Sequence, residues 1–304
     1  MSFYSELEKQ VQNILHEPRP QKVEHVIVNE IYKNTWEESL KAPDVIKIPE
    51  WDYFNQTVGG LRMHEFSILT GPTGSGKTLW LANLSVQLLV TGNKQFIASV
   101  ETGPNDYAKR MMSVISGSNF NEKDKITEDE LKNFDKSFGH LMKSNLAYFT
   151  TYQSKIEPMR IFCDLVHASR QGCKVAILDN LNFFMPIVDS RNVIQATDET
   201  IHSFVVLAKT LPMHLILVMH PRKKDSGDDR VSGISDIKGS STCVQEASNV
   251  FIFNRPSGKD ADNGFDKQTY RELMFAKLRL RGSYTYRKIM YKYNNCAYIE
   301  QELL

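Results

Sequence analysis

The chain has 304 residues and a formal net charge of +1, with 24% charged and 41% hydrophobic residues. This length is large for one domain and small for two, so we expect one large domain with an appendage. The near-neutral charge excludes a bulk attraction to nucleic acid, and no apolar run approaches the ~20 residues that span a bilayer.

The predicted elements begin with a short amphipathic helix at residues 4–16, which the two prolines of EPRPQK end. From about residue 60, short apolar strands alternate with helices. The strands are EFSILT, QFIASV, LAYFT, KVAILD and HLILVMH, and the helices are KTLWLANLSVQLLVT, PNDYAKRMMSVIS, a charged helix within 122–145, EPMRIFCDLVHASRQ and TDETIHSFVVLAKTL. After residue 249, NVFIFN, RELMFAKLRL and YRKIMYKY are predicted as antiparallel strands. The pattern indicates an α/β fold, with a mostly parallel sheet, helices on both faces and antiparallel C-terminal strands.

The same pattern divides the chain into a helix and linker at residues 1–55 and a main domain at residues 56–304. The cysteines form no C-x-x-C pair, which favours buried reduced thiols over a zinc site. They are Cys163, Cys173, Cys243 and Cys296. The N-terminus carries acidic residues and no signal-peptide core, so we expect a cytoplasmic protein, including the cytoplasm of an infected host.

The strongest motif is GPTGSGKT, which matches G-x-x-x-x-G-K-[ST] between a predicted strand and a predicted helix. Its loop is expected to curl backbone N–H groups round phosphates, at the positive end of the helix dipole. Lys77 is expected to reach the β- and γ-phosphates, and Thr78 to hold Mg²⁺ through its hydroxyl. The loop residues are Gly71, Pro72, Thr73, Gly74, Ser75 and Gly76.

Three polar residues end other predicted strands, and in a parallel sheet such ends line one ligand crevice. Asp179 ends VAILD and is expected to bind Mg²⁺ directly or through water. Glu101 ends QFIASVE and is a candidate for orienting the attacking water. His220 ends HLILVMH and is a candidate for contacting the γ-phosphate. The alternative for each is a structural role, as a strand-end cap, an exposed acid or a packed histidine.

Residues 220–242 form a long polar segment with five cations, diluted by several aspartates. Segments of this length inside compact domains are usually functional or disordered, and this composition suits a nucleic-acid backbone. A merely solvated loop is the alternative. The candidate DNA-binding residues are Arg222, Lys223, Lys224, Arg230 and Lys238.

The segment AKLRLRG is predicted to place Lys277, Arg279 and Arg281 on one face of a strand. Three cations in register repel one another, so an anionic neighbour is expected. A triphosphate held by an adjacent subunit fits, through an arginine finger. A basic edge strand that only deters aggregation is the alternative.

Taken in order, GPTGSGKT, SVE, VAILDN, VMHPRK, GSSTCVQEASNV and KLRLRG resemble the RecA-like motor of DnaB-type hexameric replicative helicases. The likeness is greatest to the helicase half of the bacteriophage primase–helicases and of the mitochondrial helicase Twinkle. It covers about residues 55–300. It implies a RecA-like P-loop NTPase core and a ring, usually a hexamer, with nucleotide sites between subunits.

The resemblance also implies roles for single residues. Lys77 and Thr78 match the phosphate and Mg²⁺ ligands, and Asp179 matches the second acidic metal residue. Glu101 matches the catalytic glutamate, and His220 matches the γ-phosphate-sensing position.

Further along the chain, Gln245 matches the glutamine that follows the DNA loop. Lys277 and Arg279 match the basic pair inserted into a neighbour's site, whereas Arg281 has no clear counterpart.

The implied activity is ATP-dependent unwinding of DNA, with ATP or another NTP or dNTP and Mg²⁺, by 5′-to-3′ movement along single-stranded DNA. No primase domain or zinc module precedes the motor, so a separate primase is expected, with a polymerase or loader as further partners. The helix at 4–16 is expected to dock on the next subunit. Two alternatives stay open: a RecA- or RadA-like recombination ATPase that forms filaments on DNA, and a P-loop ATPase that assembles other proteins without DNA.

Overall fold

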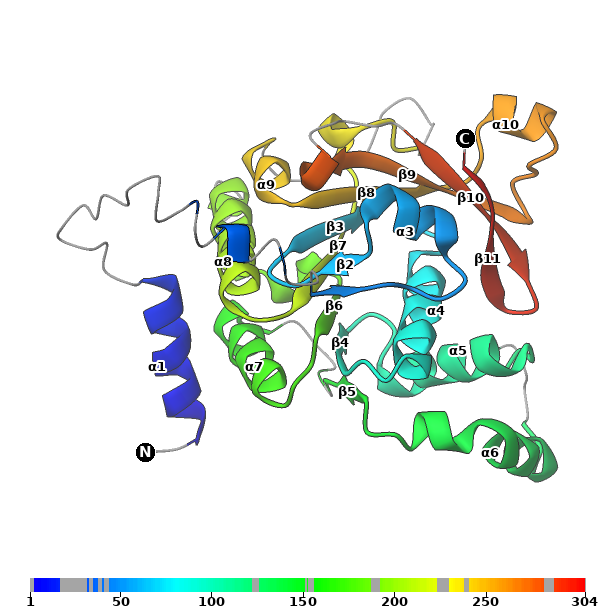
Figure 1. The fold of residues 1–304 in the computed structure, drawn as a ribbon, viewed down its shortest axis with the longest axis horizontal. Coiled ribbons are helices and arrows are strands. Elements are labelled where there is room, and N and C mark those ends of the chain that lie inside the picture. The colour runs from blue at the N-terminus through cyan, green and yellow to red at the C-terminus, as the bar shows by residue number, and fades with distance from the viewer. Residues whose placement is uncertain are drawn as a thin grey trace.

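A nine-stranded sheet forms the centre of the computed structural model, with helices on both faces (Figure 1). The strand order is β11-β10-β9-β8-β3-β7-β6-β4-β5. The structure describes residues 3–16, 32, 35–37, 40, 44–121, 126–150, 152, 156–186, 192–222, 230–237, 241–281 and 287–303. The predicted α/β class and the mostly parallel sheet are confirmed.

Six neighbouring strands of this sheet, from β8 to β5, run parallel to one another. They are β8 (Asn249–Asn254), β3 (Phe66–Thr70), β7 (His214–Met219), β6 (Val175–Asp179), β4 (Gln95–Ser99) and β5 (Ala147–Phe149). Three antiparallel strands complete the sheet: β9 (Tyr270–Leu278), β10 (Lys288–Asn294) and β11 (Ala297–Leu303). All but β5 of the parallel strands are fully buried, because helices cover both faces.

One expectation about the sheet was wrong. NVFIFN was predicted as the first antiparallel strand, but β8 pairs parallel with β3 and antiparallel only with β9. A parallel pair needs a long crossover connection. The polar segment after β7 supplies it, with the short helices η3 (Ile234–Asp236) and α9 (Ser241–Glu246) on the way.

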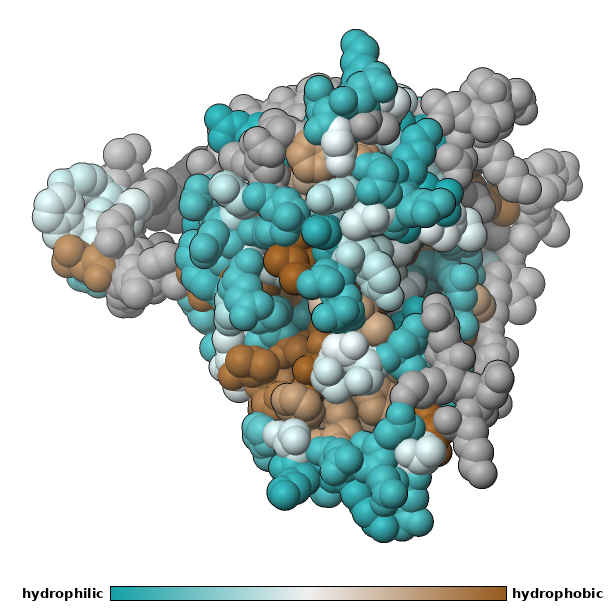
Figure 2. Space-filling model, turned by 90° about the vertical axis from the view of Figure 1, so that its right-hand side faces the viewer, coloured by the Kyte–Doolittle hydropathy of each residue, from teal (hydrophilic) through white to brown (hydrophobic). Residues whose placement is uncertain are grey.

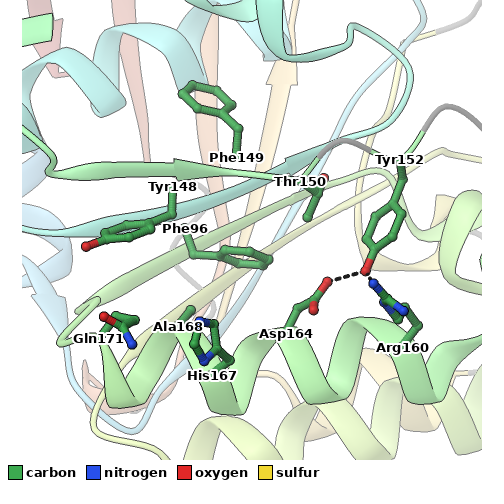
Figure 3. A pocket seen from close by; sticks show the side chains of 10 residues that line it. All are labelled: Phe96, Tyr148, Phe149, Thr150, Tyr152, Arg160, Asp164, His167, Ala168 and Gln171. Carbon is green, nitrogen blue, oxygen red and sulfur yellow. Dashed lines mark hydrogen bonds between the residues drawn. The ribbon is translucent and has the colours of Figure 1, made fainter. Parts of the chain in front are cut away.

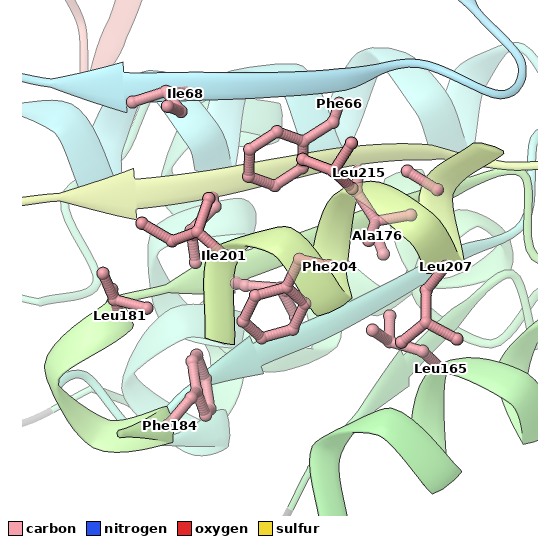
Figure 4. Packing of buried hydrophobic residues seen from close by; sticks show 14 of the residues in the cluster. Phe66, Ile68, Leu165, Ala176, Leu181, Phe184, Ile201, Phe204, Leu207 and Leu215 are labelled. Atoms are coloured by element: carbon pink, nitrogen blue, oxygen red, sulfur yellow. The ribbon is translucent and has the colours of Figure 1, made fainter. Parts of the chain in front are cut away.

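Helices cover the two faces in separate hydrophobic clusters. On one face lie α1 (Phe3–Leu15), α7 (Pro158–Arg170) and α8 (Val193–Thr210). On the other lie α3 (Asp52–Val58), α4 (Lys77–Val90) and α5 (Pro104–Ser116). Figure 4 shows the first cluster, in which Ile201 and Phe204 of α8 pack near Phe66 and Ile68 of β3.

The helix α6 (Glu128–Met142) lies outside α5, and a capping box between Thr127 and Glu130 begins it. A groove of about 290 Å³ between these helices is lined partly by Phe120, Phe134 and Phe138. Figure 2 faces the side of the molecule that is on the right in Figure 1, and apolar side chains gather there just below the middle, with hydrophilic side chains above them and at the lower end.

The N-terminal helix forms as predicted and packs against its own chain. Leu7 and Val11 of α1 are buried in the first cluster, and the Tyr4 hydroxyl donates a hydrogen bond to Asp164 of α7 at 3.0 Å. The boundary predicted at residue 55 lies inside α3. Trp51, just before this helix, stacks on Trp80 of α4 with ring centroids 4.9 Å apart.

Several short elements were not predicted from the sequence. They are the two-stranded sheet of β1 (Val45–Ile46) and β2 (Leu61–Arg62), the strand β11, and the short helices α3, α10 (Gly258–Asp262), η1 (Leu181–Phe184) and η4 (Arg279–Arg281). Cys163, Cys173 and Cys296 are buried free thiols, as expected. Within the described ranges, no helix has the length and apolar character to cross a membrane. Those same ranges hold no cluster of three or more metal-ligating His, Cys, Asp or Glu side chains.

Candidate functional site

The C-terminal ends of β3, β7, β6 and β4 lie side by side and form one edge of the sheet, which we call the rim. The P-loop, residues 71–78, follows β3, and His220 follows β7. Asp179 ends β6, and Glu101 follows β4. The structure therefore brings together all the residues that were predicted at strand ends.

Two glycines allow the P-loop to pass close to other parts of the chain. Gly71 has φ +155°, and a Cβ there would lie 2.1 Å from the Phe253 carbonyl oxygen. Gly76 has φ +96°, and a Cβ there would lie 2.2 Å from the Tyr298 hydroxyl oxygen. Gly76 also precedes α4 without a side-chain cap, which leaves the first N–H groups of the helix available to an anion.

Lys77 lies at the start of α4 and is only 7% exposed. Its ammonium group donates hydrogen bonds to the carbonyl oxygens of Gly71 and Pro72, both at 2.8 Å. Burial lowers the pKa of this amine, against the opposing effect of the Asp179 and Glu101 carboxylates. The lysine is thus a buried cation held by carbonyl dipoles inside the loop.

Thr78 and Asp179 meet across the rim, although 101 residues separate them in the sequence. The Thr78 hydroxyl donates a hydrogen bond to the Asp179 carboxylate at 3.1 Å, and Asp179 is 3% exposed. Burial, together with the Glu101 charge, raises the pKa of Asp179 to about 6, against the opposing effect of the Thr78 hydrogen bond. A hydroxyl and a carboxylate oxygen at this separation are hard ligands that suit Mg²⁺.

Glu101 is held by a residue that the sequence reasoning missed. The Asn180 side-chain amide donates a hydrogen bond to Glu101 Oε2 at 2.7 Å. Asn180 follows the metal-binding candidate Asp179 directly, so its place in VAILDN was the available signal. Glu101 also lines a cavity of about 340 Å³ with residues 102–106 and Tyr152.

Two further residues that contact the P-loop were missed, and they come from the C-terminal strands. Arg271 of β9 donates a hydrogen bond from Nε to the Ser75 carbonyl oxygen at 2.9 Å. The Tyr298 hydroxyl of β11 lies against Gly76. No local pattern marks either residue, because each is about 200 positions away from the loop.

The base of the predicted DNA loop is tied to the protein. Arg222 donates a hydrogen bond to the Ile237 carbonyl oxygen at 3.0 Å. Arg230 donates to Glu272 Oε1 and to the Arg255 carbonyl oxygen, both at 2.6 Å. Both arginines therefore have partners within the chain. The remaining candidates, Lys223, Lys224 and Lys238, lie outside the described residues.

The predicted finger residues lie at the C-terminal end of β9, away from Arg271 at its start. Lys277 donates to the carbonyl oxygens of Val244 and Gln245, at 3.1 and 2.5 Å. Arg279 donates to the carbonyl oxygens of Gln245 and Glu246, both at 3.0 Å. Burial and the Arg279 charge lower the pKa of Lys277 to about 8. Gln245 itself contributes its backbone carbonyl, and its side chain is exposed.

The expected strand alternation of Lys277, Arg279 and Arg281 was wrong, because β9 ends at Leu278 and residues 279–281 turn into a 3-10 helix. Lys277 and Arg279 still converge, because both side chains donate hydrogen bonds to carbonyl oxygens at the end of α9. They cap its last carbonyl groups, where the helix dipole favours cations.

A second cavity lies away from the P-loop, between β5 and α7 (Figure 3). Its volume is about 240 Å³, and it contains none of the predicted site residues. Tyr152 donates a hydrogen bond to Asp164 there, and Arg160 Nε donates to the Tyr152 hydroxyl at 2.6 Å. The Arg160 guanidinium also stacks on the Tyr4 ring of α1, 4.1 Å from its centroid. This cluster fastens α1 to α7.

The sequence of this chain is similar to that of known proteins. Residues 49–299 match the family model of the DnaB-like helicase C terminal domain. The replicative DNA helicase DnaB of Helicobacter pylori is 23% identical over 214 residues, which cover 68% of this chain and 44% of that relative. The chain thus spans less than half the length of this curated relative.

Two solved structures share the fold. One, described as a DnaB-like replicative helicase and its interactions with primase, has a TM-score of 0.73 at 13% identity, covering 98% of this chain and 75% of that chain. The other, described as an ATPase domain, has a TM-score of 0.70 at 15% identity, covering 92% of this chain and 100% of that chain. These likenesses confirm the RecA-like core with antiparallel C-terminal strands.

Proposed function

The chain belongs to the family of DnaB-like helicase C-terminal domains, and from this premise we propose that it is an ATP-dependent DNA helicase motor of replication. The rim supports this proposal most directly. There the buried Lys77, the Thr78–Asp179 pair and Glu101 lie at the ends of neighbouring strands. Hydrolysis of a nucleoside triphosphate needs such a phosphate cradle, a metal site and a group that orients water.

In the proposed reaction, Lys77 and the N–H groups of the P-loop hold the β- and γ-phosphates. Thr78 and Asp179 would hold Mg²⁺, which supplies positive charge at the phosphate oxygens. Glu101 orients the attacking water and accepts its proton. His220 contacts the γ-phosphate between these groups. The nucleotide is ATP, or another NTP or dNTP.

We propose a ring, closed by six copies in the family's manner, in which Lys277 and Arg279 reach the neighbour's nucleotide. The Arg279 side chain is exposed, and its hydrogen bonds go to carbonyl oxygens of α9. A phosphate would replace such partners favourably, because it adds a full negative charge opposite the guanidinium and can accept two parallel hydrogen bonds from it.

Single-stranded DNA is the proposed track, with 5′-to-3′ movement carried over from the family. The loop after β7 is the proposed contact, through Arg222, Lys223, Lys224 and Lys238, whereas Arg230 is paired with Glu272 at the base of the loop. One of the similar solved structures is described as a DnaB-like replicative helicase and its interactions with primase. We extend that relation to this chain, with a separate primase, and a polymerase or loader, as its partners in the cytoplasm.

Strand displacement on forked DNA tests the proposed function. We expect unwinding that requires a hydrolysable nucleotide and Mg²⁺, with forks that carry only a 5′ tail accepted and forks with only a 3′ tail refused. The Lys77→Ala variant is the inactive control. Filament formation and annealing without unwinding would instead indicate the RecA- or RadA-like alternative. Hydrolysis that ignores added single-stranded DNA would indicate an ATPase that assembles other proteins.

A further inference from the structure

We infer that Asn180 is the positioning residue that holds the Glu101 carboxylate in its catalytic orientation. The inference rests on the proposed hydrolysis of a nucleoside triphosphate at the rim. It assigns to the side-chain amide of Asn180 a part in turnover that is separate from nucleotide and metal binding.

Hydrogen bonds from the following residues hold both the side chain and the backbone of Asn180. The residue is 2% exposed, and it follows β6 directly. Its Oδ1 accepts a hydrogen bond from the Asn182 backbone N–H at 3.1 Å, and its backbone carbonyl oxygen accepts one from Phe183 N at 3.1 Å. Because Oδ1 is taken by an N–H donor, the Nδ2 end of the amide must face Glu101.

The helical turn after Asn180 makes this support rigid. Leu181 and Phe184 of η1 are both buried in the first hydrophobic cluster, where Figure 4 shows them beside Ile201 and Phe204 of α8. The amide is thereby anchored to the core of the protein. A rigid donor of this kind can set the position of a mobile acceptor.

Glu101, in contrast, needs such a support. Its side chain is exposed, and it borders the cavity of about 340 Å³. A free glutamate in that setting samples many rotamers. The hydrogen bond of 2.7 Å from Asn180 occupies Oε2, and the described part of the chain gives Oε1 no hydrogen-bond partner. Oε1 is therefore the oxygen left to receive the proton of the attacking water.

Two functions of Asn180 can be separated by substitution. Oδ1 caps η1 through Asn182 N–H, whereas Nδ2 serves Glu101. Asn180→Ser keeps a capping acceptor, since serine is a good N-cap residue, and loses the Nδ2 amide group that reaches Glu101. Asn180→Asp also keeps the acceptor and has the same shape, but it places a carboxylate against Glu101.

The test is a double-mutant cycle of Asn180→Ser with Glu101→Gln. It measures kcat and KM for ATP hydrolysis with Mg²⁺ and single-stranded DNA, binding of a fluorescent non-hydrolysable ATP analogue, and the unfolding temperature. We expect Asn180→Ser to lower kcat about tenfold, as for a lost hydrogen bond to a charged group, with KM and analogue binding within about twofold. In the Glu101→Gln background the same change should lower kcat no further. Asn180→Asp should lower kcat more than Asn180→Ser does.

An equal loss of kcat in both backgrounds, or a loss that follows the unfolding temperature, would overturn the inference and leave Asn180 as a cap. If Asn180→Ser does not fold, Asn180→Asp takes its place in the cycle, with the same two outcomes. Near-normal turnover of Glu101→Gln alone would overturn the catalytic assignment of Glu101 and the inference with it. A strong effect of Glu101→Gln with an additive effect of Asn180→Ser would overturn the inference alone.

Discussion

The pKa values of two groups of buried charged residues in this protein are shifted in opposite directions. In the rim, burial lowers the pKa of Lys77, and burial raises the pKa of Asp179 to about 6. In the second group, beside the C-terminal strands, burial would raise the pKa of Asp260, but hydrogen bonds from Lys288 and Ser257 lower it to about 2. Burial would also lower the pKa of Lys288, but Asp260 and Glu272 raise it.

Pairing explains the difference. In the second group, which we call the edge network, Glu272 is 0% exposed and accepts from Arg230 at 2.6 Å and from Lys288 at 3.2 Å. Lys288 also pairs with Asp260. The edge network consists of Arg230, Asp260, Glu272 and Lys288. In the rim, the hydrogen-bond partners of Lys77 are carbonyl oxygens, and the partner of Asp179 is a hydroxyl.

The comparison separates charges that serve the fold from charges that serve a ligand. A matched buried ion pair favours the charged state of both partners, and loss of one partner leaves an uncompensated charge. A buried charge without such a match costs stability, and groups with pKa values shifted in this way concentrate at functional sites. Substitutions in the rim should therefore affect activity, and substitutions in the edge network should affect stability.

The largest expected effect is that of Lys77→Ala. Hydrolysis should fall below detection, because the change removes the side-chain cation of the P-loop. The unfolding temperature should not fall, because that cation is buried and poorly paired. ATPase assays and thermal unfolding on the same preparation measure both. Lys132→Ala, on the exposed surface of α6, is the matched control and should change neither. A Lys77→Ala protein that fails to fold would place this residue with the edge network.

Arg279→Ala is expected to lower turnover by roughly 10³-fold, as for loss of an arginine finger. Arg279 follows β9, close to the C-terminal strands that carry the edge network. Its hydrogen bonds nevertheless go to carbonyl oxygens, as those of Lys77 in the rim do. The lesion should act in trans. Arg279→Ala subunits keep their own P-loop, and Lys77→Ala subunits keep their own finger.

Mixing the two inactive variants should therefore restore part of the ATPase activity. Some interfaces would then combine an intact P-loop with an intact finger, and the restored fraction should vary with the mixing ratio. Absence of recovery in assemblies shown to be mixed would mean that Arg279 acts within its own subunit, as a cap of α9.

The sequence predicted that the rim residues lie together at strand ends, and it predicted none of the ion pairs of the edge network. Lys77, Thr78 and Asp179 belong to short motifs beside apolar strands, and strand ends in a parallel sheet converge by geometry. Asn180 and Arg271 escaped notice because their roles depend on contacts across 79 and 196 positions. Arg230 was predicted as a DNA contact from composition alone. Its pairing with Glu272 depends on the fold of β9, and no local pattern encodes it.

The third effect is a loss of stability in Glu272→Gln. This change leaves the Arg230 and Lys288 cations without their shared anion, so the free energy of unfolding should fall by about 3 kcal/mol. Urea denaturation measures it. The kcat of the folded fraction should stay close to that of the unmodified protein. A variant with unchanged stability and lowered kcat would show that the edge network belongs to the site.

The smallest expected effect concerns Asp260 and depends on pH. Its pKa in the folded protein is about 2, below the ordinary value of 3.8, so the unfolded chain binds its proton first as pH falls. The stabilisation is therefore fully present above pH ~4 and is lost as pH falls through about 2; a shift of this size corresponds to about 2 kcal/mol. Asp260→Asn should lower the free energy of unfolding by up to that amount at neutral pH and flatten its decline over the acid range. Asp262→Asn, an exposed position in the same helix α10, is the control and should reproduce the unmodified profile. If the two variants give the same profile, Asp260 adds nothing to the edge network, and Glu272 alone holds Lys288.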